Sequence, residues 1–128
     1  MTPLITLYFV AGFALMHVVI TMLVGAARVP NQVHFYDEGD LNLRRNQRAH
    51  ANFCENIPMA LITMAAAETS GTPARWIITG GLVIVAGRLL HYYIIRVRGW
   101  GNARAVSMLM TLMPIVGFAG LTLWNLSA

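Results

Sequence analysis

The residues best suited to chemistry form a polar run from Arg44 to Pro58, which leads into an otherwise apolar segment. At about 100° per residue in an α-helix, Arg48, Asn52 and Glu55 fall within a roughly 60° arc. We call these three residues the polar stripe. It directs charged and hydrogen-bonding groups at one target, and the sequence therefore favours a ligand site over a structural polar seam between helices.

The composition places this run in a membrane protein. Hydrophobic residues make up 57% of the chain and charged residues 11%, and the mean hydropathy is +0.60, well above the value of a water-soluble domain. The net charge of +4 comes from arginine, because the chain contains no lysine. The arginines cluster near helix ends, as the positive-inside rule expects, so we expect membrane lipids and no nucleic acid as partners.

The hydropathy pattern predicts an all-α membrane protein, a four-transmembrane-helix bundle within a single domain, residues 1–128. Asp40 is suited to cap the second helix and Pro73 to start the third. The arginine-rich loops follow the first and third helices, which predicts that both termini are non-cytoplasmic. The expected helices are 4–27, 41–68, 74–96 and 103–126.

This topology predicts a partner for the carboxylate of the polar stripe. Glu55 and Arg88 each lie roughly ten residues inside the cytoplasmic helix ends, or ~15 Å deep. A lone charge at that depth costs ~2.5 to 3.5 kcal/mol even on the lenient insertion scale. We therefore expect a structural ion pair between Glu55 and Arg88. His17 lies at the same level and is expected to be a core histidine bonded to a neighbouring helix.

The sequence predicts no metal site. Cys54 is the single cysteine, which excludes a cysteine metal cluster, and it is most simply a small packing residue. His34 lies in a loop with no second ligand at metal spacing.

The run from Arg48 to Pro58, RAHANFCENIP, resembles the helix-2 signature R-A-x-x-N-x-x-E-x-x-P of the MAPEG family, the membrane-associated proteins in eicosanoid and glutathione metabolism. The resemblance extends to Arg28 at the end of helix 1, to the Arg88-x-x-His91 pair, and to Arg104 at the start of helix 4. It implies a left-handed four-helix bundle that assembles as a homotrimer. It also implies glutathione at each subunit interface near the cytoplasm, between helices 1 and 2 of one subunit and helices 3 and 4 of its neighbour.

Carried over residue by residue, the resemblance assigns roles in a glutathione transferase or peroxidase. Arg104 would stabilise the glutathione thiolate, because a thiol of pKa ~8.5 needs a neighbouring cation to become a good nucleophile. The thiolate would attack a small lipophilic electrophile or a lipid hydroperoxide from the bilayer, with glutathione as co-substrate. The residues expected to bind glutathione are Arg28, Arg48, Asn52, Glu55 and His91.

Two alternatives stay open. Catalytic members often carry Tyr, Tyr and Ser where this chain has Asn56, Ile95 and Ala105, which suits a member that binds a thiol or lipid without turnover. Outside the family, a small four-helix proton-coupled multidrug exporter would use Glu55 as its coupling group. The absence of lysine and the short loops fit a prokaryotic inner (plasma) membrane protein whose site faces the cytoplasm.

Overall fold

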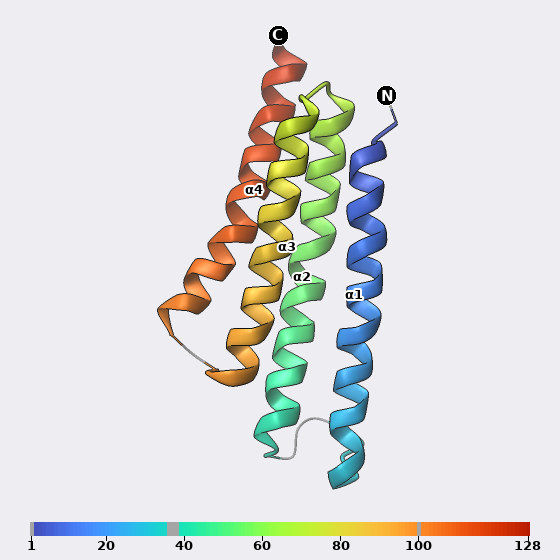
Figure 1. The fold of residues 1–128 in the computed structure, drawn as a ribbon, viewed down its shortest axis with the longest axis vertical. Helices are drawn as coiled ribbons and strands as arrows, with labels where there is room; N and C mark the ends of the chain where they lie inside the picture. The colour runs from blue at the N-terminus through green and yellow to red at the C-terminus, as the bar shows by residue number, and fades with distance from the viewer. Residues whose placement is uncertain (1, 36–38, 100) are drawn as a thin grey trace.

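The computed structural model describes residues 2–35, 39–99 and 101–128, and these form four long helices that lie side by side (Figure 1). A short 3-10 turn follows the first helix at Val29–Asn31. Both chain ends lie at the same end of the bundle, and α1 and α4 lie on opposite sides of the α2/α3 pair (Figure 1). The helices are α1 (Leu4–Arg28), α2 (Leu41–Thr69), α3 (Ala74–Val97) and α4 (Asn102–Ser127).

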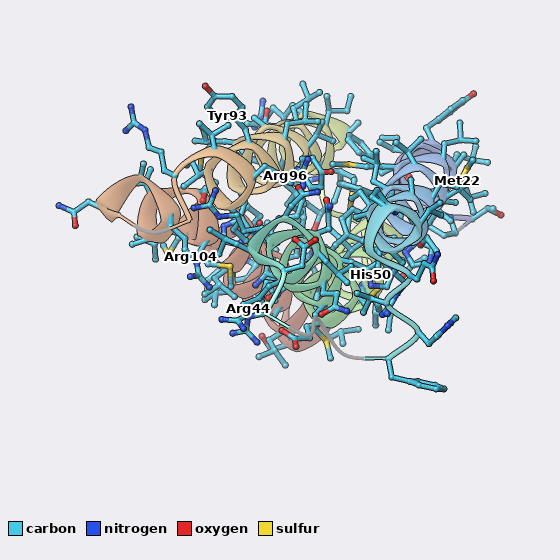
Figure 2. All side chains as sticks on the ribbon, turned by 90° about the horizontal axis from the view of Figure 1, so that it is seen from below. Met22, Arg44, His50, Tyr93, Arg96 and Arg104 are labelled. Carbon is cyan, nitrogen blue, oxygen red and sulfur yellow. The ribbon has the colours of Figure 1, made fainter. Side chains whose placement is uncertain are left out.

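The all-helical, four-helix prediction is confirmed, and each observed helix end lies within one residue of its expected position. By length and composition, α1, α3 and α4 can each cross a membrane. The 29 residues of α2 span about 43 Å, but its first turns are polar and it does not meet the same hydropathy criterion. Large apolar side chains such as Met22 and Tyr93 point outward from the bundle (Figure 2), as expected for a surface that faces lipid.

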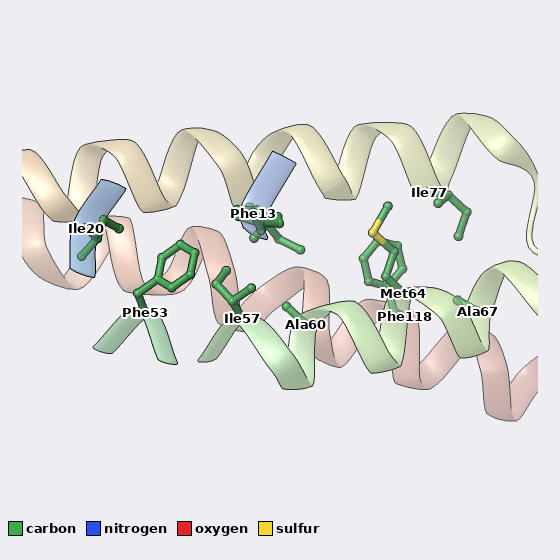
Figure 3. Close-up of a cluster of buried hydrophobic side chains, with 10 residues drawn as sticks. Phe13, Ile20, Phe53, Ile57, Ala60, Met64, Ala67, Ile77 and Phe118 are labelled. Carbon is green, nitrogen blue, oxygen red and sulfur yellow. The ribbon is translucent and has the colours of Figure 1, made fainter. Parts of the chain in front are cut away.

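The core is built from regularly spaced apolar residues. In α1 the buried positions are Thr6, Phe13, Ile20 and Ala27, a seven-residue spacing typical of helices that pack at a shallow angle. In α2 the buried positions recur every three or four residues, so one face of the helix points into the bundle. Figure 3 shows the resulting apolar cluster, formed by Phe13, Ile20, Phe53, Ile57, Ala60, Met64, Ala67, Ile77, Ile84 and Phe118.

Gly87 lets α3 and α4 approach closely at the level of the predicted site. A Cβ atom at this position would lie 2.7 Å from Met110 Cβ and 3.2 Å from the Ser107 carbonyl oxygen. Any larger residue would therefore push α4 away. Arg88 follows Gly87 directly, so this close approach brings the Arg88 guanidinium within reach of α4.

Glu68, near the end of α2, caps the first turn of α1. Its Oε1 accepts the Ile5 N–H at 2.8 Å, and its Oε2 accepts the Thr6 N–H at 2.8 Å and the Thr6 hydroxyl at 2.6 Å. The residue before α1 is Pro3, which provides no side-chain cap. A carboxylate from the neighbouring helix thus satisfies amides at the positive end of the α1 dipole and ties α1 to α2.

At the opposite end of the bundle, polar side chains fasten α2 to α3. Asp40 accepts the Leu43 N–H at 3.0 Å, which confirms the expected cap. Arg45 donates to the Arg96 carbonyl at 3.2 Å, and Arg96 donates to Asn42 Oδ1 at 2.7 Å. The first turns of α2, which carry the approach to the polar stripe, are therefore held against the last turn of α3.

We predict that Glu68→Gln destabilises the protein by about 1–2 kcal/mol, because an amide cannot accept all three hydrogen bonds and carries no charge for the helix dipole. Thermal unfolding in detergent would measure the loss. Glu55→Gln makes the same chemical change at an exposed carboxylate and is the matched control. Equal midpoints for the two variants would show that the Glu68 cap contributes nothing.

Candidate functional site

Arg88 is the most deeply buried charge in the described chain, with 3% of its surface exposed. Its Nη1 donates to Asn52 Oδ1 at 2.6 Å, and its Nη2 lies 3.5 Å from both the Ser107 carbonyl oxygen and Met108 Sδ. Asn52 Nδ2 also contacts Met108 Sδ at 3.6 Å. One guanidinium from α3 therefore joins the polar stripe of α2 to the second turn of α4.

The predicted ion pair between Glu55 and Arg88 is wrong for the described residues. Asn52, almost one turn earlier on α2, occupies the guanidinium instead. Glu55 lies roughly 60° around the helix from Asn52, and its side chain is exposed. Because the Asn52 side chain is the partner of Arg88, the Glu55 carboxylate lies on the surface of the bundle and not against this guanidinium.

The polar stripe meets Arg104 in a small polar pocket. Arg48, Ala51, Asn52, Glu55 and Arg104 line this pocket, which has a volume of about 20 Å³. The space is enough for about one water molecule. This pocket thus brings together four of the predicted site residues within one subunit. Three of them belong to α2 and the fourth, Arg104, belongs to α4.

A larger cavity adjoins this pocket at the end of the bundle where Figure 2 shows Arg44, Arg96 and Arg104. Its volume is about 350 Å³, within the ~300 to 1,000 Å³ range of small-molecule sites. Arg48 and Arg104 line both spaces. The lining of the larger one, which we call the arginine cavity, is Leu41, Arg44, Arg45, Arg48, Ile95, Arg98, Gly99 and Arg104.

Two predicted binding residues lie elsewhere in the chain. Arg28 donates to the Val33 and His34 carbonyls at 3.4 and 3.3 Å and lines a separate cavity at the end of α1. His91 is buried between α3 and α4, with 2% of its surface exposed. Neither side chain lines the pocket that holds Glu55 and Arg104.

Ser107 explains the position of His91 and was not among the predicted residues. Its hydroxyl donates to the Arg104 carbonyl at 2.8 Å, so it accepts from His91 Nδ1 at 2.9 Å. This chain of hydrogen bonds links His91 to the first turn of α4, where Arg104 lies. His91 therefore positions the Arg104 backbone. In the sequence, the signal for this role is that Ser107 is a polar residue on the face of α4 that packs against α3.

The three departures from the catalytic pattern have distinct surroundings. The Asn56 amide donates to the Asn52 carbonyl of its own helix at 2.8 Å. Ile95 is buried and lines the arginine cavity. Ala105 lies next to a third space, of about 320 Å³, which it shares with Gly101, Asn102, Arg104 and Met108.

We predict strong energetic coupling between Asn52 and Arg88. In a double-mutant cycle with Asn52→Ala and Arg88→Met, the coupling energy should be about 1–3 kcal/mol, because each single change strips a buried group of its partner. A parallel cycle of Glu55→Gln with Arg88→Met should give a coupling near zero. Chemical unfolding in detergent measures both coupling energies. A larger coupling energy for Glu55 with Arg88 than for Asn52 with Arg88 would support the Glu55–Arg88 ion pair instead.

The chain is similar in sequence to known inner membrane proteins. The chain is 36% identical over 66 residues to the inner membrane protein YecN of Escherichia coli K12, and equally to YecN of E. coli O6:H1. The alignment covers 52% of this chain and 50% of YecN, so the chain spans about half the length of these curated relatives.

The profile of the MAPEG family matches a much longer stretch, residues 6–124. This stretch includes nearly all of α1 to α4, and with it the polar stripe, Arg88 and Arg104. The membrane character expected from composition agrees with this match and with the inner-membrane relatives. The chain belongs to the MAPEG family of membrane proteins.

Proposed function

We propose that the protein binds glutathione at the arginine-rich end of the bundle and activates its thiol for reaction with lipophilic electrophiles or lipid hydroperoxides. The main support for this proposal is the position of Arg104, which lines the small polar pocket, the arginine cavity and the space beside Ala105. One cation thus lies where three open spaces meet.

The charges around Arg104 match those of glutathione. This tripeptide carries two carboxylates, one ammonium group and one thiol. Arginine forks bind carboxylates with paired hydrogen bonds, and Arg44, Arg45, Arg48 and Arg98 line the arginine cavity. Glu55, in the adjoining pocket, is the acid that would accept the ammonium group.

The thiol would be activated by charge. A nearby guanidinium favours the thiolate over the thiol and so raises the concentration of the nucleophile at neutral pH. Arg104 fills this role if the glutathione sulfur lies at the junction of the three spaces. The lipophilic substrate would approach from the side of Ala105 and Met108, where the wall is largely apolar.

The sizes of the spaces support assembly around the ligand. The pocket beside Glu55 is far below the ~300 Å³ expected of a small-molecule site, and Arg28 lies outside it. A neighbouring subunit would supply the missing wall. Since the MAPEG resemblance implies a trimer, we propose a homotrimer with glutathione between subunits, in which Arg28 of α1 completes a site shared with a neighbour.

In the membrane, α2 would be the fourth span, with its first turns projecting from the bilayer. The positive-inside rule then places the arginine cavity on the cytoplasmic side and both termini on the opposite side. We propose that this membrane is a prokaryotic inner membrane, as it is for the YecN relatives.

A binding protein without turnover is the second candidate. Ile95 and Ala105 present no hydroxyl to the arginine cavity and the neighbouring space, so Arg104 would have to activate the thiol without a tyrosine or serine at these positions. The exporter alternative loses support because the chain belongs to the MAPEG family. An ion pair between Glu55 and Arg88 would have been a further argument against proton coupling, but the structure does not have it. Family membership is therefore the argument against the exporter.

The test is glutathione binding by the detergent-purified protein, followed both by equilibrium dialysis and by the ultraviolet absorbance of the bound thiolate. Arg48→Ala should weaken binding about tenfold or more, because one charge-assisted contact with a carboxylate is worth at least ~1.4 kcal/mol. Arg104→Ala should abolish the thiolate absorbance. Arg75→Ala, at the opposite end of α3, is the control and should change neither signal.

Three outcomes separate the possibilities. Binding with a thiolate absorbance that depends on Arg104 supports the enzyme. Binding without this absorbance supports the second candidate, a binding protein. If glutathione fails to bind, or if Arg75→Ala weakens binding as much as Arg48→Ala, the arginine cavity is not a glutathione site.

A further inference from the structure

Three potential metal ligands meet on the side of α2 that faces α1. His50 and Cys54 are four residues apart, one above the other on the same face of α2. His17 reaches them from α1, and one donor atom from each of the three residues lies within 4.8 Å of the other two. Cys54 Sγ lies 3.8 Å from His17 Nδ1, 3.7 Å from His50 Nε2 and 3.9 Å from His50 Nδ1.

These separations suit a bound cation. With Zn–S near 2.3 Å and Zn–N near 2.0 Å, a tetrahedral site places sulfur and nitrogen roughly 3.5 Å apart. The observed sulfur-to-nitrogen distances exceed this by a few tenths of an ångström, and small rotations of the side chains would close the difference. A thiol hydrogen bond at 3.7 to 3.9 Å is weak, so attraction within the cluster does not by itself account for the convergence.

An outer partner further supports the arrangement. Thr21 Oγ1 lies 3.1 Å from His50 Nε2. Metal-bound histidines usually bond through their second ring nitrogen to an outer group that fixes the ring. Thr21 can take this role if the metal binds His50 Nδ1, which lies 3.9 Å from Cys54 Sγ, and leaves Nε2, at 3.7 Å from the sulfur, to Thr21. The His17 ring also stacks on Phe53, with ring centroids 6.0 Å apart, which restrains its orientation.

The apolar surroundings single out this cluster. His17 and Cys54 line an apolar groove of about 360 Å³ together with Phe13, Ile57 and Leu61. Polar groups at membrane depth are expensive and mark functional sites by default. Cys54 is exposed, which corrects its assignment as a packing residue.

We propose that His17, His50 and Cys54 form a Zn²⁺ site that joins α1 to α2, with a fourth coordination position open. A thiolate with two imidazoles is a donor set that suits this ion. The expectation of no metal site, drawn from the sequence, is replaced by this proposal. The site lies roughly 150° around α2 from the polar stripe, so it uses none of the side chains proposed to bind glutathione.

The first test is Co²⁺ titration of the detergent-purified full chain, without an affinity tag and without glutathione. We expect one Co²⁺ per chain, a thiolate-to-cobalt charge-transfer band, and loss of that band when Zn²⁺ is added. His17→Gln, His50→Gln and Cys54→Ser should each weaken binding at least tenfold. His34→Gln, which alters a histidine outside the cluster, should bind as the wild type does.

The second test uses the single cysteine and stays informative if a variant folds poorly. Zn²⁺ should slow alkylation of Cys54 by N-ethylmaleimide in the wild type and in His34→Gln, as read by intact mass. In His17→Gln and His50→Gln the ion should give no protection. An absent cobalt band, a band that survives loss of either histidine, or alkylation unaffected by Zn²⁺ would each overturn the proposal.

Discussion

The arrangement of the site depends on one buried guanidinium. Arg88 lies inside the bundle, where an unpartnered charge is expensive, and its hydrogen bond to Asn52 together with its contacts to Ser107 and Met108 meets most of that demand. Because these groups belong to α2 and α4, satisfying Arg88 fixes both helices against α3. Gly87 makes the contact with α4 possible by removing the side chain that would separate the two helices.

This constraint explains why Glu55 and Arg104 meet at the surface. Once Asn52 holds Arg88, the rest of the polar stripe points outward from the bundle, and the fixed position of α4 brings Arg104 beside it. His91 and Ser107 then hold the backbone of the first turn of α4. The side chains of Arg48 and Glu55, which we propose bind glutathione, are thus exposed. Arg88, His91 and Ser107, which fix the helices around them, are buried, and buried support of this kind keeps a polar site rigid.

Much of this could be predicted from the sequence. Helix periodicity and the Asp40 cap are local signals, so the four helices and the shared face of the polar stripe follow from spacing alone. Partners across helices depend on how each helix is rotated about its axis, which spacing within one helix does not determine. For this reason the sequence predicts Glu55 as the partner of Arg88, whereas the structure has Asn52, and the sequence gives no indication that His17 meets Cys54.

We propose that glutathione lies between the polar stripe and Arg104. A structure of the protein in lipid nanodiscs with glutathione would test it most directly. We predict ligand density in contact with Arg48 and Glu55, with the sulfur facing the Arg104 guanidinium. Density confined to another surface, or an empty arginine cavity at saturating glutathione, would contradict this binding site.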